Sequence, residues 1–151
     1  MINVVAVGKK HEDWVEDGIR RYEKRLKQPW NLTWELIAHS SFEGDRARQE
    51  ESERILKRLK TDDTVLLLDE QGVMLTSPQL CAQIEGSFAA TGRTIVIIGG
   101  SYGVTESLQE RADTVISLSK LVFPHQLVRL LLVEQLYRAQ EIARGGHYHH
   151  E

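Results

Sequence analysis

The segment 124–134 carries a histidine and an arginine that can act on the same molecule. His125 and Arg129 are four positions apart, so they share one face if the segment is a helix. An imidazole can donate or accept a proton near neutral pH, and a guanidinium binds anions. Arg129 stands between Val128 and Leu130 in an otherwise apolar stretch, where an arginine is unusual. We therefore expect His125 to act as acid, base or hydrogen-bond donor and Arg129 to hold an anion. The alternative is a histidine at a helix start and a surface ion pair.

A glycine-rich turn follows a predicted buried strand at residues 99–103. Gly99, Gly100 and Gly103 allow the backbone to turn sharply and to approach a ligand with its amide groups. The pattern differs from the dinucleotide fingerprint and lacks the Lys-Ser/Thr pair of a phosphate-binding loop, so dinucleotide and ATP chemistry are disfavoured. Two interpretations remain, a ligand-binding turn and a tight turn without a ligand.

The connection between the last predicted strand and the last helix is apolar with interspersed polar residues. Such a segment can form an apolar slot with exposed backbone donors and acceptors, which is what an adenine base requires. The alternative is a plain strand-to-helix connection. Its residues are Leu118, Ser119, Lys120, Leu121, Val122 and Phe123.

The chain end and the single cysteine bear on metal binding. The tail 147–151 holds imidazoles and a carboxylate, but a chain end seldom forms a preorganised site, and no internal His-Glu-x-x-His cluster accompanies it. Cys81 is alone in the chain, which excludes an internal disulfide and a multi-cysteine zinc site. We expect no bound metal; a metal hydrolase that depends on the tail is a distant alternative.

The elements that position these residues follow from the apolar periodicity. Trp14 is expected on the apolar face of the first helix, and Ser77 with Pro78 is expected to cap and start the third. The second helix has apolar residues only in its second half, so its start is expected to be less firmly held. Strands are predicted at 2–7, 32–38, 64–68, 94–98 and 114–118, and helices at 14–26, 45–60, 77–88, 105–112 and 124–144.

This alternation predicts an α/β fold with a mainly parallel sheet covered by helices on both faces. Ligands of such sheets bind beyond the carboxyl ends of the strands, so the loops 69–72, 99–103 and 119–125 are expected to form the site.

Length and composition indicate one globular domain, residues 1–151, because hydrophobic residues make up 41 % and charged residues 27 % of the chain. The apolar runs reach four residues, far short of the roughly 20 that a membrane crossing requires. The amino terminus lacks the basic flank of a signal peptide, so we expect a cytoplasmic protein. The net charge of -3 argues against binding free nucleic acid mainly by electrostatic attraction, although the last quarter of the chain is locally basic.

Two blocks near the carboxyl end are the most specific features, residues 124–129 (PHQLVR) and 134–139 (EQLYRA). They occur together with residues 5–9 (VAVGK), 22–26 (YEKRL), 98–103 (IGGSYG) and 118–120 (LSK), and with the terminal Tyr148-His149. In this combination the chain resembles, over essentially its whole length, the ribosomal RNA large subunit methyltransferase H family of the SPOUT superfamily.

The resemblance implies an α/β fold whose carboxyl-terminal segment forms a trefoil knot, a rare exception among chain connections. It also implies a homodimer, S-adenosylmethionine as methyl donor, and transfer to N3 of a pseudouridine in helix 69 of 23S rRNA within the assembled 70S ribosome. By motif match, Gly100 and Gly103 would shape the cofactor pocket, which would be lined by Leu68, Gly99, Leu118, Ser119, Lys120, Leu121, Val122 and Phe123.

The same resemblance suggests roles for four residues in catalysis. Arg129 would hold a substrate phosphate or a base oxygen, and His125 or His149 would assist proton removal. Tyr148 would stack on the base or orient it, as aromatic side chains do with exposed RNA bases.

Three positions depart from the usual pattern of the family. Val122 stands where many members have threonine, which removes a hydroxyl from the cofactor loop. His147 replaces a proline, which leaves the tail less rigid, and His150 replaces what is often a lysine or arginine.

A different class of function uses the same glycine turn: a non-catalytic regulatory module that binds adenosine or a nucleotide. The enzyme would bind S-adenosylmethionine and S-adenosylhomocysteine without added metal, the module would prefer nucleotides, and a metal hydrolase would lose activity with chelators.

Overall fold

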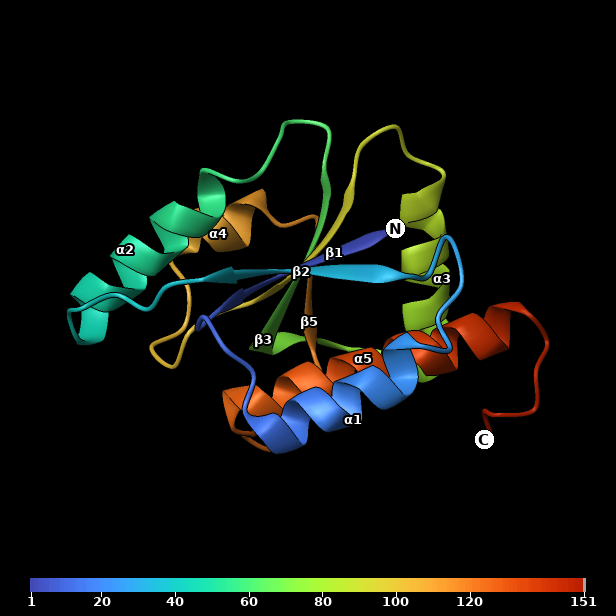
Figure 1. Cartoon of the computed structure of the whole chain (residues 1–151). Coiled ribbons are helices and arrows are strands. Elements are labelled where there is room, and N and C mark those ends of the chain that lie inside the picture. The colour runs from blue at the N-terminus through green and yellow to red at the C-terminus, as the bar shows by residue number, and fades with distance from the viewer. Residues whose placement is uncertain (151) are drawn as a thin grey trace.

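Five strands lie side by side in one parallel sheet, in the order β2-β1-β4-β3-β5 (Figure 1). The computed structural model describes residues 1–150, and within them no helix combines the length and the apolar character that a bilayer crossing demands. The strands are β1 (Ile2–Val7), β2 (Leu32–Ile37), β3 (Thr64–Met74), β4 (Thr94–Ile98) and β5 (Thr114–Ser117). The helices are α1 (Asp13–Glu23), α2 (Gly44–Leu56), α3 (Ser77–Phe88), α4 (Glu106–Arg111) and α5 (His125–Ala143).

Each face of the sheet has its own hydrophobic core. Val4 and Ala6 of β1 belong to the core that α3 and α5 cover, whereas Val5 and Val7 belong to the core under α2 and α4. Helix α1 packs on α5, and Val15 of α1 belongs to a third, smaller hydrophobic cluster between these two helices. Because the inner strands are buried on both faces, they read in the sequence as continuous apolar runs. The predicted fold class, a parallel α/β sheet with helices on both faces, is confirmed.

Strand β3 continues past its predicted end at Leu68 and reaches Met74. Its pairing with β5 shifts register between Leu68 and Val73. Gly72 lies so close to β5 that a Cβ there would come within 2.6 Å of the Val115 backbone. The segment 69–72, predicted as a loop, is therefore an irregular part of a strand, because glycine allows two backbones to approach.

One helix cap and one helix face differ from the prediction. Thr76, one residue before the predicted cap, accepts a hydrogen bond from the Gln79 amide (3.2 Å) and donates its own amide to the Gln79 side chain (2.9 Å). Trp14 is 55 % exposed, because Val15 and Ile19 form the buried face of α1. The capping residue is therefore Thr76 and not Ser77, because a threonine hydroxyl can accept the same capping hydrogen bond as a serine hydroxyl.

Helix α2 is packed in both of its halves. Ala47 is buried in the first half and Ile55 in the second, with Glu51 and Ser52 buried between them. Polar residues therefore extend the buried face as far as Ala47, whereas residues 44–46 at the start of the helix are exposed, and a less firmly held start stays a prediction. The Ser52 hydroxyl accepts a hydrogen bond from the Thr105 amide (3.0 Å), which connects α2 with the start of α4.

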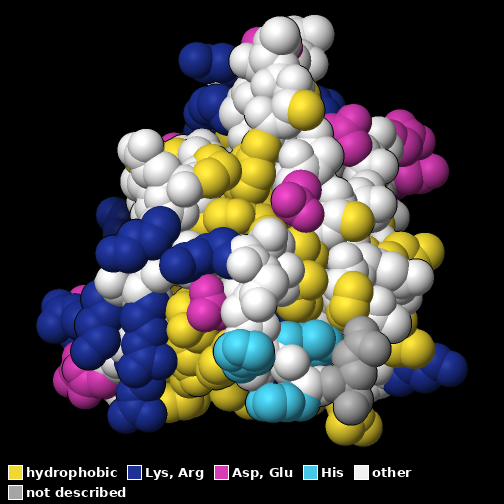
Figure 2. Space-filling model, turned by 90° about the vertical axis from the view of Figure 1, so that its right-hand side faces the viewer, with side chains coloured by type: hydrophobic (Ala, Val, Ile, Leu, Met, Phe, Trp, Pro, Cys, Tyr) yellow, Lys and Arg dark blue, Asp and Glu magenta, His cyan; other side chains and the backbone are white. Residues whose placement is uncertain are grey.

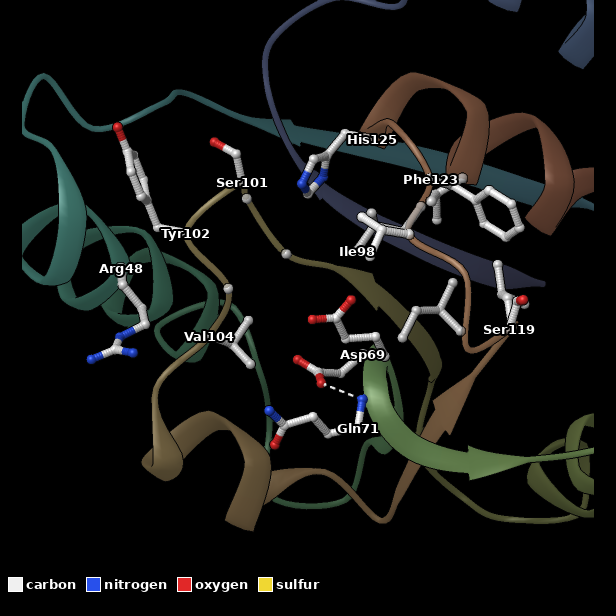
Figure 3. A pocket seen from close by; sticks show the side chains of 18 of the residues that line it. Arg48, Asp69, Gln71, Ile98, Ser101, Tyr102, Val104, Ser119, Phe123 and His125 are labelled. Atoms are coloured by element: carbon white, nitrogen blue, oxygen red, sulfur yellow. Dashed lines mark hydrogen bonds between the residues drawn. The ribbon is translucent and has the colours of Figure 1, made fainter.

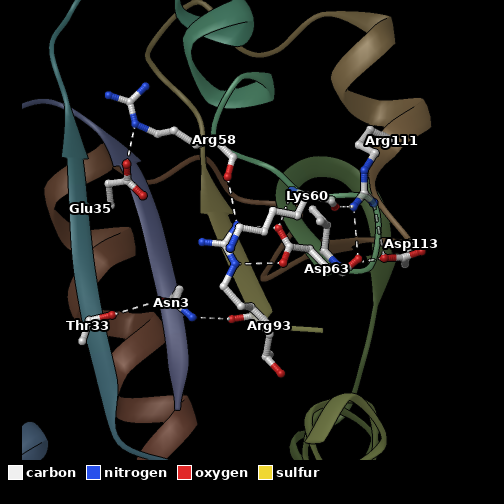
Figure 4. Close-up of polar contacts among 11 residues, drawn as sticks. Asn3, Thr33, Glu35, Arg58, Lys60, Asp63, Arg93, Arg111 and Asp113 are labelled. Carbon is white, nitrogen blue, oxygen red and sulfur yellow. Dashed lines mark hydrogen bonds and ion pairs between the residues drawn. The ribbon is translucent and has the colours of Figure 1, made fainter. Parts of the chain in front are cut away.

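A polar network ties β3 to β4 at their amino ends (Figure 4). The buried carboxylate of Asp63 accepts two hydrogen bonds from the Arg93 guanidinium (2.9 and 2.6 Å) and one from the Lys60 amide (2.7 Å). Arg111 donates to the carbonyls of Lys60 and Asp63 (2.7 and 3.1 Å). Burial alone would raise the pKa of Asp63, but the bonds from Arg93 and Lys60 hold this pKa below its usual value.

Candidate active site

The loops at the carboxyl ends of β3, β4 and β5 enclose a pocket of about 530 Å³ (Figure 3). Leu68 and Ile98, where the regular parts of β3 and β4 end, line it together with Val128 of α5. Its walls are residues 98–104 and most of the connection 118–123. This volume lies in the range of small-molecule sites, and the mixture of apolar side chains and glycine backbone suits a ligand with a flat apolar part.

Most positions predicted to hold a cofactor line this one pocket. The connection 118–123 is shaped by its own serines: the Ser117 hydroxyl donates to the Ser119 carbonyl (2.8 Å), and the Ser119 hydroxyl accepts from the Leu121 amide (3.0 Å). Lys120 lies outside the pocket lining and is exposed. The predicted residues that line the pocket are Leu68, Gly99, Gly100, Gly103, Leu118, Ser119, Leu121, Val122 and Phe123. Their contact with a cofactor stays a prediction.

Packing on the protein side explains the glycines of the turn after β4. A Cβ on Gly99 would lie 2.7 Å from the Val104 side chain, and one on Gly100 would lie 2.4 Å from Oε1 of Glu51. Gly103 has a φ of 81°, which side-chain-bearing residues rarely adopt, and its amide donates to the Gly100 carbonyl (3.0 Å). The turn therefore presents backbone to the pocket while α2 fills the space behind it.

His125, the first residue of α5, lines the pocket and stands beside the glycine turn. Burial lowers its pKa, and the positive charges of Arg129 and His39 add to this effect. Glu51 and a hydrogen bond with the Gly99 backbone oppose the shift. Because the pKa lies below the ordinary value of 6.5, the imidazole is neutral at pH 7 and can accept a proton.

The guanidinium of Arg129 is buried, with 1 % of the residue exposed, and it serves the backbone of the chain itself. Nη2 donates to the carbonyls of Val7 and Gly8 (2.9 and 3.0 Å), and Nη1 donates to the carbonyl of Lys10 (3.1 Å). Nη1 also lies 3.1 Å from Nδ1 of His11. The alternative of a surface ion pair is therefore wrong, because the partners are carbonyls in the interior. The predicted contact with a substrate anion stays a prediction.

The tail lies against the second half of α5. The Tyr148 hydroxyl donates to Oε1 of Glu134 (3.1 Å), and burial together with this carboxylate raises the pKa of Tyr148. His149 Nδ1 lies 3.2 Å from Nη1 of Arg138. Figure 2 shows histidine side chains gathered at this end of the molecule. Within residues 1–150 no three His, Cys, Asp or Glu side chains are grouped as metal ligands.

The four predicted catalytic residues therefore form two separate groups. His125 and Arg129 stand at the start of α5, near the pocket, whereas Tyr148 and His149 contact residues 134–138. At a rise of about 1.5 Å per residue, residues 134–138 lie about 14 to 20 Å along the helix from His125 and about 8 to 14 Å from Arg129. Figure 1 shows α5 running from the carboxyl edge of the sheet toward the chain end.

The sequence prediction did not single out two polar residues beside the site. Glu51 is a charged residue in the stripe that Ala47 and Ile55 form at a spacing of four, and this is the same kind of signal that pointed to Arg129. His39 lies two residues after the end of β2, and nothing in its sequence neighbours indicates a role. Asp69 of the expected loop 69–72 lines the pocket, where its carboxylate accepts a hydrogen bond from a backbone amide two residues later (2.9 Å).

The fold is a parallel α/β sheet with a pocket beside its last strand and last helix, and one known protein family matches this chain. The protein-family model described as "Predicted SPOUT methyltransferase" matches residues 1–149. This places the chain among the SPOUT methyltransferases, enzymes whose fold is the α/β knot.

Curated relatives narrow the assignment. Proteins named ribosomal RNA large subunit methyltransferase H from Acetivibrio thermocellus and Desulfitobacterium hafniense are 40 % and 41 % identical to this chain, each alignment covering 98 % of both proteins. The protein of that name from Geobacter metallireducens is 38 % identical over 99 % of this chain and 98 % of its own. The chain belongs to the ribosomal RNA large subunit methyltransferase H family. The predicted resemblance is confirmed, and an enzyme is favoured over a regulatory module.

Proposed function

We propose that this protein transfers a methyl group from S-adenosylmethionine to N3 of a pseudouridine in helix 69 of 23S rRNA, within the assembled 70S ribosome of the cytoplasm. The observation that carries the proposal is a pocket walled by the glycine turn and the connection 118–123, with the neutral imidazole of His125 beside it, in a chain of this family. The name of these relatives, ribosomal RNA large subunit methyltransferase H, supports ribosomal RNA as the substrate class.

The residues around the pocket fit the proposed methyl donor. The apolar side chains of Leu68, Ile98 and Leu118 suit the faces of an adenine base, and the backbone of Gly99 and of residues 118–123 supplies hydrogen-bonding groups for its edge. S-adenosylmethionine supplies a methyl group on a sulfonium, so a covalent enzyme intermediate is not required. The work of the protein is to align the acceptor with that methyl group and to favour loss of the acceptor proton.

His125 is the residue best placed to receive that proton. Its imidazole is neutral at pH 7 and lines the pocket, which are the two requirements of a general base. Arg129 keeps the connection after β1 fixed next to α5 through its three bonds to backbone carbonyls. We therefore propose that Arg129 supports catalysis by holding this connection, in addition to the predicted contact with a substrate oxygen.

The separation of tail and pocket supports a homodimer as the working unit. Tyr148 and His149 contact the second half of α5, far from the pocket of their own chain. A second copy can bring its tail to this pocket, where Tyr148 would stack on or orient the base. Leu121 and Val122, which are 71 % and 79 % exposed at the pocket rim, offer an apolar surface for such a partner.

The charge of the protein supports recognition of a particle in preference to free RNA. A net charge of -3 provides little general attraction to phosphates. We therefore expect weak methylation of naked 23S rRNA and efficient methylation of ribosomes that lack the modification.

The experiment that tests the proposed function incubates such ribosomes with labelled S-adenosylmethionine and maps the labelled nucleotide. Label at N3 of a pseudouridine in helix 69 is the expected result. Label elsewhere, or efficient labelling of protein-free rRNA, would contradict the proposal. Calorimetry with S-adenosylmethionine, S-adenosylhomocysteine and ATP, with and without a chelator, separates the methyltransferase from a nucleotide-binding module and from a metal-dependent enzyme.

A further inference from the structure

A second group of polar side chains lies beside the pocket, with a buried carboxylate at its centre. Only 3 % of Glu51 is exposed. Its Oε2 accepts a hydrogen bond from the Ser40 amide (2.9 Å). Among residues 1–150 its Oε1 has no hydrogen-bond partner, and it lies against Gly100 of the glycine turn. A buried carboxylate oxygen without a protein partner is costly, and a positive charge that arises nearby stabilises it.

His39 faces the same carboxylate from the end of β2. Its Nδ1 is 3.8 Å from Oε2 of Glu51. Its Nε2 lies 3.1 Å from the position that a Cβ on Gly8 would take, and Nη2 of Arg129 lies 2.9 Å from that position. Because 66 % of the His39 side chain is exposed, this residue connects the buried Glu51 with solvent.

His125 approaches the group from the side of the pocket. It lines the pocket together with Gly99, the neighbour of the glycine on which Glu51 packs. The charges that act on it come from three elements: Arg129 of α5, His39 after β2, and Glu51 of α2. Glu51 is the acidic member of this set.

The surroundings of His39 include one further cation. Arg54 of α2 donates to the carbonyls of Ala38 and His39 (2.9 and 3.2 Å) and is paired with Glu50. The charged groups that act on His125 or contact His39 therefore include the cations Arg54 and Arg129 and the anion Glu51, with Glu50 neutralising Arg54. The side chains of Arg48, Asp69 and Glu70 line the same pocket as His125.

Building on the proposed methyl transfer, we propose that Glu51 is a positioning residue for proton removal: its carboxylate stabilises the positive charge that His125 acquires when it takes up the proton of the acceptor nitrogen, while His39 faces the same carboxylate from the solvent side. The N3–H bond breaks, and the proton passes to the imidazole of His125. The electron pair left on N3 forms the bond to the methyl carbon, while the C–S bond breaks and its electron pair stays on sulfur. The imidazolium of His125 then releases the proton to water.

The test removes the charge of Glu51 and measures the pKa values of His125 and His39. Glu51→Gln is compared with Glu53→Gln, the same change on the exposed side of the same helix. NMR titration of the free protein gives the pKa of His125 and His39, and single-turnover methylation of unmodified ribosomes gives a pH–rate profile. Loss of the carboxylate destabilises the imidazolium, so we expect a lower pKa of His125, an acid limb moved to lower pH, and a rate reduced about 10- to 100-fold. Glu53→Gln should behave like the wild type.

A second variant should shift the pKa of His125 in the opposite direction, and it leaves the buried carboxylate in place. His39→Gln replaces an exposed side chain and removes a positive charge near His125. The pKa of His125 should rise, and the acid limb of the rate profile should move to higher pH. This variant decides the matter if Glu51→Gln fails to fold, which circular dichroism would reveal.

An unchanged pKa of His125 in the folded variants would overturn the proposal. A lower rate with an unmoved acid limb would do the same, because it would mark Glu51 as merely structural. The NMR measurement needs no substrate, so it separates this proposal from the proposed function. Ribosomes that stay unlabelled by the wild-type protein would count against the function, whereas immobile pKa values would count against Glu51 alone.

Discussion

A buried guanidinium can serve a site without touching the ligand, and Arg129 is placed to do this. Its bonds to the carbonyls of Val7, Gly8 and Lys10 span the connection after β1, which lies next to His39 and the start of α5. The Lys10 carbonyl also accepts a hydrogen bond from the Gln126 side chain (3.2 Å), so removal of the guanidinium bears mainly on the buried carbonyls of Val7 and Gly8, which lose a charge-assisted bond each.

We expect Arg129→Ala to lower the free energy of unfolding by about 3 kcal/mol, because it deletes charge-assisted bonds and opens a cavity. Arg129→Lys keeps the charge but loses the planar fork, so it should retain only part of this stability. Urea unfolding gives the stability, and single-turnover methylation at a temperature where the variant is folded gives the rate. Wild-type rates for the alanine variant would remove Arg129 from any part in catalysis.

Gly100 should be far less tolerant than Lys120. Gly100→Ala places a Cβ 2.4 Å from Oε1 of Glu51, so either the turn or α2 must move, at a cost of about 1–3 kcal/mol. Calorimetry should show weaker binding of S-adenosylmethionine by a factor of ten or more. Lys120→Ala, outside the pocket lining, should leave the affinity within about twofold of the wild type. Equal affinities for the two variants would show that the turn does not contact the ligand.

The candidate site was partly predictable from single residues. The apolar neighbours of Arg129 marked it as buried or functional, and the glycine pattern marked the turn. The direction of the Arg129 side chain was not predictable, because its partners are carbonyls of a segment about 120 residues earlier. Glu51 and His39 were not predicted for the same reason, because these residues come together only when β2, α2 and β4 are assembled. Residue type can suggest chemistry, but long-range packing decides which groups face each other.

At the scale of elements, strands were easier to predict than their ends. The runs 2–7 and 94–98 coincide with β1 and β4 because both strands are buried on two faces and are followed by a glycine. The run 64–68 ended too early because the continuation to Met74 is polar and depends on pairing with β5 across a register shift. Such a segment has no apolar periodicity of its own, so its conformation is set by a neighbouring strand.

The cap of α3 gives a test at this scale. Thr76→Ala removes the hydroxyl that accepts a hydrogen bond from the Gln79 amide, so we expect the free energy of unfolding to fall by about 1 kcal/mol. Thr61→Ala, in an exposed turn, should change it by less than about 0.5 kcal/mol. Urea denaturation of both variants makes the comparison. Equal stabilities would mean that the cap contributes nothing in this fold.

At the scale of the whole molecule, stability in acid depends on the end of the sheet opposite the pocket. Asp63 has a lowered pKa in the folded state, so its contribution is fully present above its unfolded pKa of about 3.9 and is lost as pH falls through the lower folded value. Asp63→Asn should destabilise the protein at neutral pH by about 3 kcal/mol, and the difference from the wild type should shrink in acid. Thermal unfolding from neutral to acidic pH checks this. Asp62→Asn, an exposed neighbour, should follow the wild-type curve.

The tail gives a second test of the whole molecule, since it depends on the proposed homodimer. His125→Ala damages the pocket end of a chain and Tyr148→Ala its tail, so each homodimer should be nearly inactive. A mixed dimer holds one site with an intact pocket and an intact partner tail, and should regain a substantial part of the activity of one site. Co-expressed chains with two affinity tags allow this measurement. Failure to regain activity would indicate that each tail serves its own chain or none.

The pocket joins three stretches that the chain delivers at very different times during its synthesis, residues 68–71, 98–104 and 118–128. All three stretches must be in place before the pocket exists, so a ligand of this pocket binds the folded chain and not the unfolded one. The free energy of its binding therefore adds to the stability of the native state.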